Sequence, residues 1–224
     1  MLTTTATLKQ PSLRDQALRV IREGMVSGEL EPGGIYSATA LATQLGVSAS
    51  PVREAMLTLV NQGLMEAVRN RGFRVLPLDE EDRREIYEMR CLLEVPATAA
   101  LAGRQEIIDE YEKFRALAEE IVTSAIAKDL INYLDADRRF HLGLLEHSNN
   151  NRLVTTIDGL RDQTRLYGLK SLSDKGTLVD SAEEHQPILD ALVAGDADEV
   201  RELMQHHLRH IRGDWADAKF DQSS

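Results

Sequence analysis

The chain has 224 residues, of which 42% are hydrophobic and 28% are charged, a composition typical of one ordinary folded domain or two small ones. A disordered or fibrous chain is therefore excluded. No run of 18 apolar residues is present and residues 1–10 lack the apolar core of a secretory signal, so we expect a cytoplasmic protein. The single cysteine, Cys91, agrees with a reducing compartment.

The net charge of −11 is distributed unevenly along the chain. Residues 1–78 carry 8 Lys and Arg against 6 Asp and Glu, net +2, whereas the remainder is net −13. An acidic helix start begins directly after Leu76-Pro77-Leu78. We therefore predict two domains with different partners, residues 11–78 and 79–218, between a disordered tail at 1–10 and a loose tail at 219–224.

The first domain begins with three predicted helices. Apolar spacing indicates a helix over about 13–28 and a short one over about 38–45, and residues 46–48 can form a tight left-handed turn. A helix over about 51–62 follows, with Ser50 as its N-cap. Two short helices joined by a tight turn can place the second helix in the major groove of DNA.

A β-hairpin is predicted next, with strands at 64–68 and 73–76 and with Asn70 and Gly72 in its turn. Basic residues at its tip suit DNA phosphates or the minor groove. The alternative is that the turn belongs to an ordinary three-helix unit and that the arginines are only solvated. On spacing, the candidates for DNA contact are Ser48, Ala49, Ser50, Arg53, Arg69, Arg71 and Arg74.

The second domain is predicted to be an all-helical antiparallel bundle, which makes the protein mainly α. Pro96 and Pro187 lie inside helical patterns and predict kinks or local breaks. Ser181 with Glu184, and Asp196 with Glu199, are expected to cap the last two helices. The six predicted helices cover about 80–102, 105–127, 129–148, 151–170, 181–194 and 196–218.

All six histidines fall between residues 141 and 210. Helical periodicity places Asp137 and His141 on the apolar face of one predicted helix, and His185 and His207 on the apolar faces of two others. Each such polar group costs about 1–3 kcal/mol unless satisfied, and the four can satisfy one another by sharing a cation. Three nitrogens and one oxygen suit Zn, Ni or Mn with coordination positions left open. The alternative is that each histidine is a hydrogen-bonded core residue.

Residues 13–78 resemble the winged helix-turn-helix of GntR-type bacterial transcription regulators. The resemblance is carried by GELEPG, LATQLGVSASPVREAM, LVNQGLM and NRGFRVLPL. It departs from the family at Ala49, where an Arg is usual, and at Ala38, where an acidic residue is usual, which leaves the operator preference open. The resemblance implies that a dimer meets DNA through Ser48, Ser50, Arg53, Asn70, Arg71 and Gly72.

Residues 83–212 resemble the helical ligand-binding FCD domain of the FadR branch of that family. The matching segments are IYEMRCLLEVPATAALA, DADRRFHLGLLEHSNNNRL, EEHQPILDALVAGD and LMQHHL. About six helices rather than seven indicate the VanR-like subgroup, and Pro187 is a departure expected to bend the helix that carries His185. The family's metal residues fall on Asp137, His141, His185 and His207.

A cation held by three imidazoles and one carboxylate keeps a charge near +1, so its open positions favour an anion. Arg90, which stands four residues before Glu94, could meet an effector carboxylate bidentately. Arg161 and Arg165 could do the same. The alternative for these arginines is pairing with the many acids of their own domain.

Three hypotheses follow. The first is a homodimeric repressor that binds a palindromic DNA operator and senses a small carboxylate through a metal-containing helical domain. The second is a small metal-dependent enzyme that uses the His and Asp site, against which no obvious general base stands beside the site. The third is a regulator whose helical domain only dimerises. We favour the first and expect no enzyme. Nothing in the sequence identifies the effector, the metal or the operator.

Overall fold

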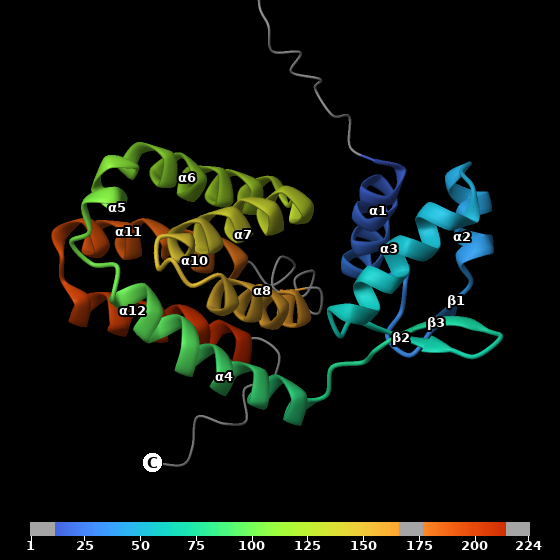
Figure 1. Ribbon diagram of the computed structural model, residues 1–224. Coiled ribbons are helices and arrows are strands. Elements are labelled where there is room, and N and C mark those ends of the chain that lie inside the picture. The colour runs from blue at the N-terminus through green and yellow to red at the C-terminus, as the bar shows by residue number, and fades with distance from the viewer. Residues whose placement is uncertain (1–11, 166–176, 214–224) are drawn as a thin grey trace, which may run out of the picture. The chain divides into compact units, whose positions relative to one another are not determined.

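The structure is a computed structural model that describes residues 12–165 and 177–213. The chain divides into two compact units, Met1–Pro77 and Leu78–Ser224. The mainly α fold class is confirmed, with a small sheet in the first unit and helices throughout the described part of the second (Figure 1). The predicted tails at 1–10 and 219–224, and the predicted helix ends beyond residues 165 and 213, lie outside the described residues.

The first unit is a three-helix core with a three-stranded antiparallel sheet in the order β1-β3-β2. Its buried side chains come mainly from the inner faces of α1 and α3, which pack together. The strand β1 was not predicted, because two residues are too short to show a period. The elements are α1 (Leu13–Ser27), β1 (Ile35–Tyr36), α2 (Ala38–Leu45), α3 (Ala49–Asn61), β2 (Met65–Val68) and β3 (Gly72–Val75).

The predicted N-cap of α3 is wrong by two residues. Ser48, in extended backbone, is the N-cap, and α3 begins at Ala49. Ser50 already lies in the first turn, where its hydroxyl donates to Glu54 Oε1 at 3.2 Å. Pro51 is still tolerated because backbone N–H groups of the first turn have no partner within the helix.

The predicted hairpin is confirmed. Asn70 takes a left-handed conformation with φ of 59°, and the Arg71 amide donates to the Val68 carbonyl at 3.1 Å. Gly72 has φ of 127°, and a Cβ there would lie 2.3 Å from the carbonyl oxygen of Tyr36. Glycine is therefore required at this position, where β3 begins beside the end of β1.

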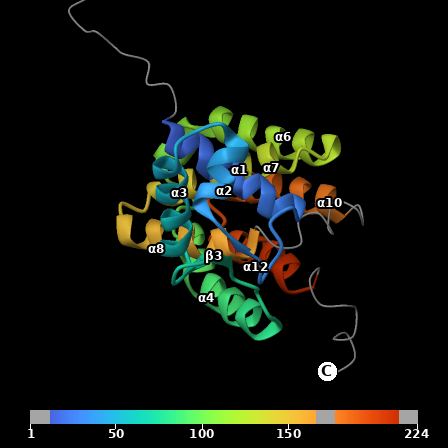
Figure 2. The same cartoon turned by 90° about the vertical axis from the view of Figure 1, so that its right-hand side faces the viewer.

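In the second unit, α6 and α7 lie on one side and α4 and α12 on the other, with α8, α10 and α11 between them (Figures 1 and 2). The helix pairs that pack most extensively are α4 with α12 and α6 with α7, followed by α4 with α8 and α6 with α10. The elements are α4 (Glu80–Ala99), α5 (Gln105–Asp109), α6 (Tyr111–Ala127), α7 (Leu130–Glu146), α8 (Asn151–Arg165), α10 (Thr177–Glu183), α11 (His185–Ala194) and α12 (Ala197–Gly213).

The described residues of this unit hold eight helical segments rather than six, so the helix count gives no support to the VanR-like subgroup. The predicted helix 105–127 is two helices, separated where Glu110 leaves helical backbone with φ of −96° and ψ of 11°. The predicted helix 80–102 ends at Ala99. The helix α4 runs through Pro96 without interruption, so the break predicted there does not occur. Pro96 itself is exposed.

The predicted helix 181–194 differs most from the structure. Pro187 has no N–H to donate to the Glu183 carbonyl, and the helix is interrupted at Glu184, as predicted for this proline. Ser181 is buried inside α10 and is not an N-cap, because α10 already begins at Thr177. Asp196 is confirmed as a cap of α12, since its Oδ1 accepts from the Glu199 amide at 3.0 Å.

Candidate functional site

The four predicted metal ligands come together inside the second unit. Asp137 and His141 lie one turn apart on α7, His185 is the first residue of α11, and His207 lies on α12. All four side chains are buried, and each offers a ligand atom within 4.8 Å of the others. We call these four residues the His/Asp cluster.

The distances inside the cluster are short. His141 Nε2 lies 3.1 Å from His185 Nε2, and His185 Nε2 lies 3.1 Å from Asp137 Oδ1. His141 Nε2 lies 3.6 Å from the same oxygen. The His207 ring stacks on His141, with centroids 5.0 Å apart, and meets His185 edge-on at 4.7 Å.

Two of the imidazoles are oriented by groups outside the cluster. His185 Nδ1 lies 2.9 Å from the Ala182 carbonyl, which can only accept, so Nδ1 carries the proton and Nε2 keeps a lone pair. His207 Nδ1 lies 2.8 Å from Glu184 Oε2, which fixes the same tautomer. Such outer hydrogen bonds are typical of histidines that ligate metals.

The charge state of the imidazoles also fits a metal. Burial lowers the pKa of His141 well below its usual value. Burial lowers the pKa of His207 to about 3, although the Glu184 carboxylate acts in the opposite direction. Both rings are therefore neutral near pH 7, which is the form that binds metal. The donor set fits a divalent transition cation.

Beside the cluster, Arg90 and Arg161 surround one carboxylate, that of Glu94. Arg90 donates to both Glu94 oxygens and to Thr164 Oγ1, the latter at 3.2 Å. Arg161 Nη1 donates to Glu94 Oε2 at 2.5 Å, and its Nη2 donates to Asp137 Oδ2 at 2.8 Å. Asp137 therefore belongs both to the cluster and to this arginine network.

The electrostatics of the network are set by burial and by the two guanidinium groups. Burial raises the pKa of the Glu94 carboxyl, but Arg90 and Arg161 outweigh it and lower that pKa to about 2. Arg161 Nε is buried without a hydrogen-bond partner. Of the predicted effector residues, Arg90 and Arg161 thus pair with internal acids. Arg165 is the last residue of α8, and its side chain lies outside the described part.

The sequence did not point to Glu184 and Thr164 as partners of the site. Glu184 was predicted as a helix cap, and only the packing of α12 on α11 brings it to His207. Thr164 carries no pattern of its own in the sequence. His147 and Asn150 lie at helix ends as expected, His147 as the C-cap of α7.

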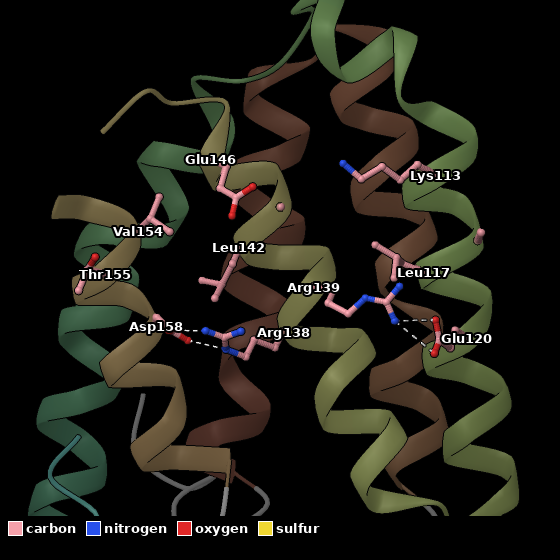
Figure 3. A pocket seen from close by; sticks show the side chains of 12 residues that line it. Lys113, Leu117, Glu120, Arg138, Arg139, Leu142, Glu146, Val154, Thr155 and Asp158 are labelled. Carbon is pink, nitrogen blue, oxygen red and sulfur yellow. Dashed lines mark hydrogen bonds and ion pairs between the residues drawn. The ribbon is translucent and has the colours of Figure 1, made fainter. Parts of the chain in front are cut away.

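A cavity of about 560 Å³ is lined by residues of α6, α7 and α8 (Figure 3). Arg138 and Arg139 line it, but both are paired, Arg138 with Asp158 on α8 and Arg139 with Glu120 on α6. Among the side chains that the structure describes, none of the four cluster residues lines this cavity, and neither Arg90 nor Arg161 does.

The predicted DNA-contact residues lie in the first unit. Ser48, Ser50 and Arg53 are exposed around the start of α3, and the Arg53 guanidinium lies 5.8 Å from the centre of the Phe73 ring. Arg69, Asn70 and Arg71 are exposed at the hairpin tip, and Gly72 is half-buried at the start of β3. Arg74, by contrast, pairs with Glu66 across the hairpin.

Among the described residues, no helix is both long enough and apolar enough to cross a membrane. Residues 85–210 match the family model of the FCD domain, and residues 13–75 match that of the bacterial regulatory proteins of the gntR family.

The similar proteins are regulators. A probable D-xylose utilization operon transcriptional repressor from Paenarthrobacter nicotinovorans is 30% identical over 208 residues, which are 92% of this chain and 89% of the relative. The transcriptional regulator McbR of Escherichia coli (strain K12) is 28% identical over 91% of this chain and 95% of its own. The solved structure of E. coli McbR/YncC superimposes with a TM-score of 0.72 at 25% identity, over 90% of this chain and 95% of that one. The chain therefore belongs to the GntR family of bacterial transcriptional regulators, carries an FCD domain, and is a regulator rather than an enzyme.

Proposed function

We propose that the protein is a homodimeric repressor that acts in the cytoplasm and releases a palindromic DNA operator when its FCD domain binds a small carboxylate. The observation that carries this proposal is the His/Asp cluster, in which outer hydrogen bonds orient His185 and His207 and beside which two buried arginines lie. Four ligand atoms lie within 4.8 Å of one another, and the two outer hydrogen bonds leave Nε2 of His185 and of His207 without a proton, which is the form that ligates a metal.

In this proposal Asp137, His141, His185 and His207 hold one divalent transition metal, which is Zn, Ni or Mn. Asp137 offers Oδ1 to the metal while its Oδ2 stays on Arg161. A cation bound there supplies positive charge and open coordination positions for an anionic oxygen.

The charge of the site supports an anionic effector. Arg90 and Arg161 supply two positive charges, Glu94 and Asp137 supply two negative ones, and histidines that ligate a metal are neutral. A divalent cation therefore leaves the buried site with an excess of two positive charges, and an uncompensated buried charge is costly. A small organic acid that meets Arg90, Arg161 and Arg165 reduces this excess.

DNA contact is assigned to the first unit. Ser48, Ser50 and Arg53 are proposed to meet the major groove, and Arg69, Asn70, Arg71 and Gly72 to meet the backbone or minor groove. The P. nicotinovorans relative is named a probable transcriptional repressor, which supports repression rather than activation. Binding of the effector would favour one spacing of the paired DNA-binding units over another.

The test combines metal analysis with DNA binding. Protein purified without a histidine tag should contain close to one transition metal per chain by elemental analysis. A DNA duplex selected by the protein from random sequence should be released on addition of one member of a panel of small carboxylates, as followed by fluorescence anisotropy. Absence of metal, with no uptake after incubation with Zn²⁺, Ni²⁺ or Mn²⁺, would instead support a helical domain that only dimerises.

A further inference from the structure

Glu184 occupies the break between α10 and α11, next to the proposed ligand His185. The break follows from Pro187, so Glu184 belongs to neither helix, although its backbone remains in the right-handed helical region. Its side chain is mostly enclosed, with 18% of its surface exposed. A carboxylate in such a place needs partners.

The partners of Glu184 come from α12. Its Oε2 lies 2.8 Å from His207 Nδ1, and its Oε1 lies 3.1 Å from Nε2 of the exposed His206. Because a carboxylate accepts, the proton of His207 stays on Nδ1 and the lone pair on Nε2 is left for the cluster.

The same short segment orients a second ring of the cluster. The carbonyl of Ala182 holds His185 Nδ1 at 2.9 Å. The orienting groups of two imidazoles, on α11 and α12, thus come from residues 182–184 at one break in the backbone. Of these two groups, only Glu184 acts through a side chain, so it is the one that mutation can remove.

We propose that Glu184 is a positioning residue for the metal, which fixes the tautomer and the ring orientation of His207 without contacting the cation. The inference rests on the proposed metal site. Outer-shell partners of this kind typically contribute a factor of about 10–100 to metal affinity.

The experiment measures Zn²⁺ affinity by competition with a chromophoric chelator. Glu184→Ala should weaken binding about 10–100-fold, and Glu184→Gln, which keeps an accepting oxygen, should restore part of the loss. Glu183→Ala removes the same charge from the exposed neighbouring residue and should leave the affinity unchanged. His206→Ala removes a partner of Glu184 outside the cluster and should also leave the Zn²⁺ affinity close to wild type.

A double-mutant cycle shows whether the effect passes through His207. If Glu184 acts only by positioning that ring, adding Glu184→Ala to His207→Ala should cause no further loss of affinity. The visible spectrum of the Co²⁺-substituted protein gives a second readout, because a displaced imidazole changes the ligand field. Should Glu184→Ala fail to fold, as judged by circular dichroism, Glu184→Gln and its double variant with His207→Ala carry the same test.

The outcomes separate this inference from the proposed function. A wild-type protein that binds no metal would overturn the metal site itself, and the role of Glu184 with it. A wild-type protein that binds Zn²⁺, with Glu184→Ala equal to Glu183→Ala or fully additive with His207→Ala, would overturn only the role of Glu184.

Discussion

His185 Nε2 lies 3.1 Å from Asp137 Oδ1, although 48 residues separate the two side chains in the sequence. The other oxygen of Asp137 accepts from Arg161, which also holds Glu94. One carboxylate therefore joins the His/Asp cluster to the arginine network, and a change in either can reach the other through Asp137.

Glu94→Gln should be strongly destabilising. Glu94 is fully buried and is the shared partner of Arg90 and Arg161, so the amide would leave the buried Arg90 without its anion and Arg161 with Asp137 alone. Removing one partner from a buried ion pair typically costs about 3–5 kcal/mol. Urea unfolding at pH 7 measures the difference. Glu88→Gln is the matched control, because Glu88 is exposed and forms an ion pair with Arg84 that is open to solvent. Solvent-exposed ion pairs contribute little to the free energy of unfolding. Equal losses in the two variants would contradict the buried network.

The metal-free protein should lose stability as the pH falls below about 6.5. The pKa of His207 in the folded chain is lowered to about 3 and that of His141 is also lowered, whereas both titrate near 6.5 when unfolded. Between these values the unfolded state binds more protons, so each histidine lowers the free energy of unfolding by up to about 1.4 kcal/mol per pH unit. Urea midpoints measured between pH 7.5 and 5.5 with a chelator present check this.

His207→Gln should flatten that pH dependence, because it removes one of the two neutral buried imidazoles. A wild-type slope near zero would mean that these rings do not stay neutral in the folded protein.

Arg53→Ala and Arg71→Ala should each weaken binding to the selected duplex. Both side chains are exposed, one on α3 and one at the hairpin tip, so the fold should persist. If each arginine contacts a phosphate, the slope of the logarithm of affinity against the logarithm of salt concentration should fall by about one unit. Arg115→Ala on α6, a half-buried arginine of the FCD domain, is the control. Anisotropy titrations at several salt concentrations in which all three variants match wild type would refute this DNA surface.

Much of the fold could be predicted because local signals suffice for it. Gly28 and Gly46 end α1 and α2 in left-handed backbone, and Asn70 turns the hairpin, as the sequence indicates. The strand β1 could not be predicted, since Ile35 and Tyr36 become a strand only by pairing with Arg74 and Phe73. A two-residue strand is too short to show the alternation of apolar and polar residues from which a strand is predicted.

The cluster could be predicted because each of its members interrupts an apolar helix face. The partners of the cluster could not. Arg161 lies on the buried side of α8, but its ion pairs with Glu94 and Asp137 depend on how α4, α7 and α8 pack. The role of Glu184 could not be predicted either. Its local spacing indicates a helix cap, whereas its contact with His207 depends on tertiary packing.

His141→Ala should separate effector response from DNA binding. The substitution removes a central ligand, so metal affinity should fall by more than the roughly 10–100-fold typical of an outer-shell change. The response to a carboxylate that needs the cation should be lost with it. The fold should persist, because Asp137 keeps its ion pair with Arg161 and the apolar core of the bundle is unchanged. The DNA-binding unit, which packs around its own buried face, should still bind the selected duplex.

The measurement is anisotropy of the labelled duplex with increasing carboxylate, for wild type, His141→Ala and His147→Ala. His147 is a histidine at the C-terminus of the same helix but outside the cluster, so its variant should respond as wild type does. Wild type and His147→Ala should release DNA, whereas His141→Ala should hold it at every effector concentration. Release from His141→Ala at the wild-type concentration would show that the effector acts at a place independent of the cluster. The cavity between α6, α7 and α8, which Arg138 and Arg139 line, would then be the next candidate for the effector site.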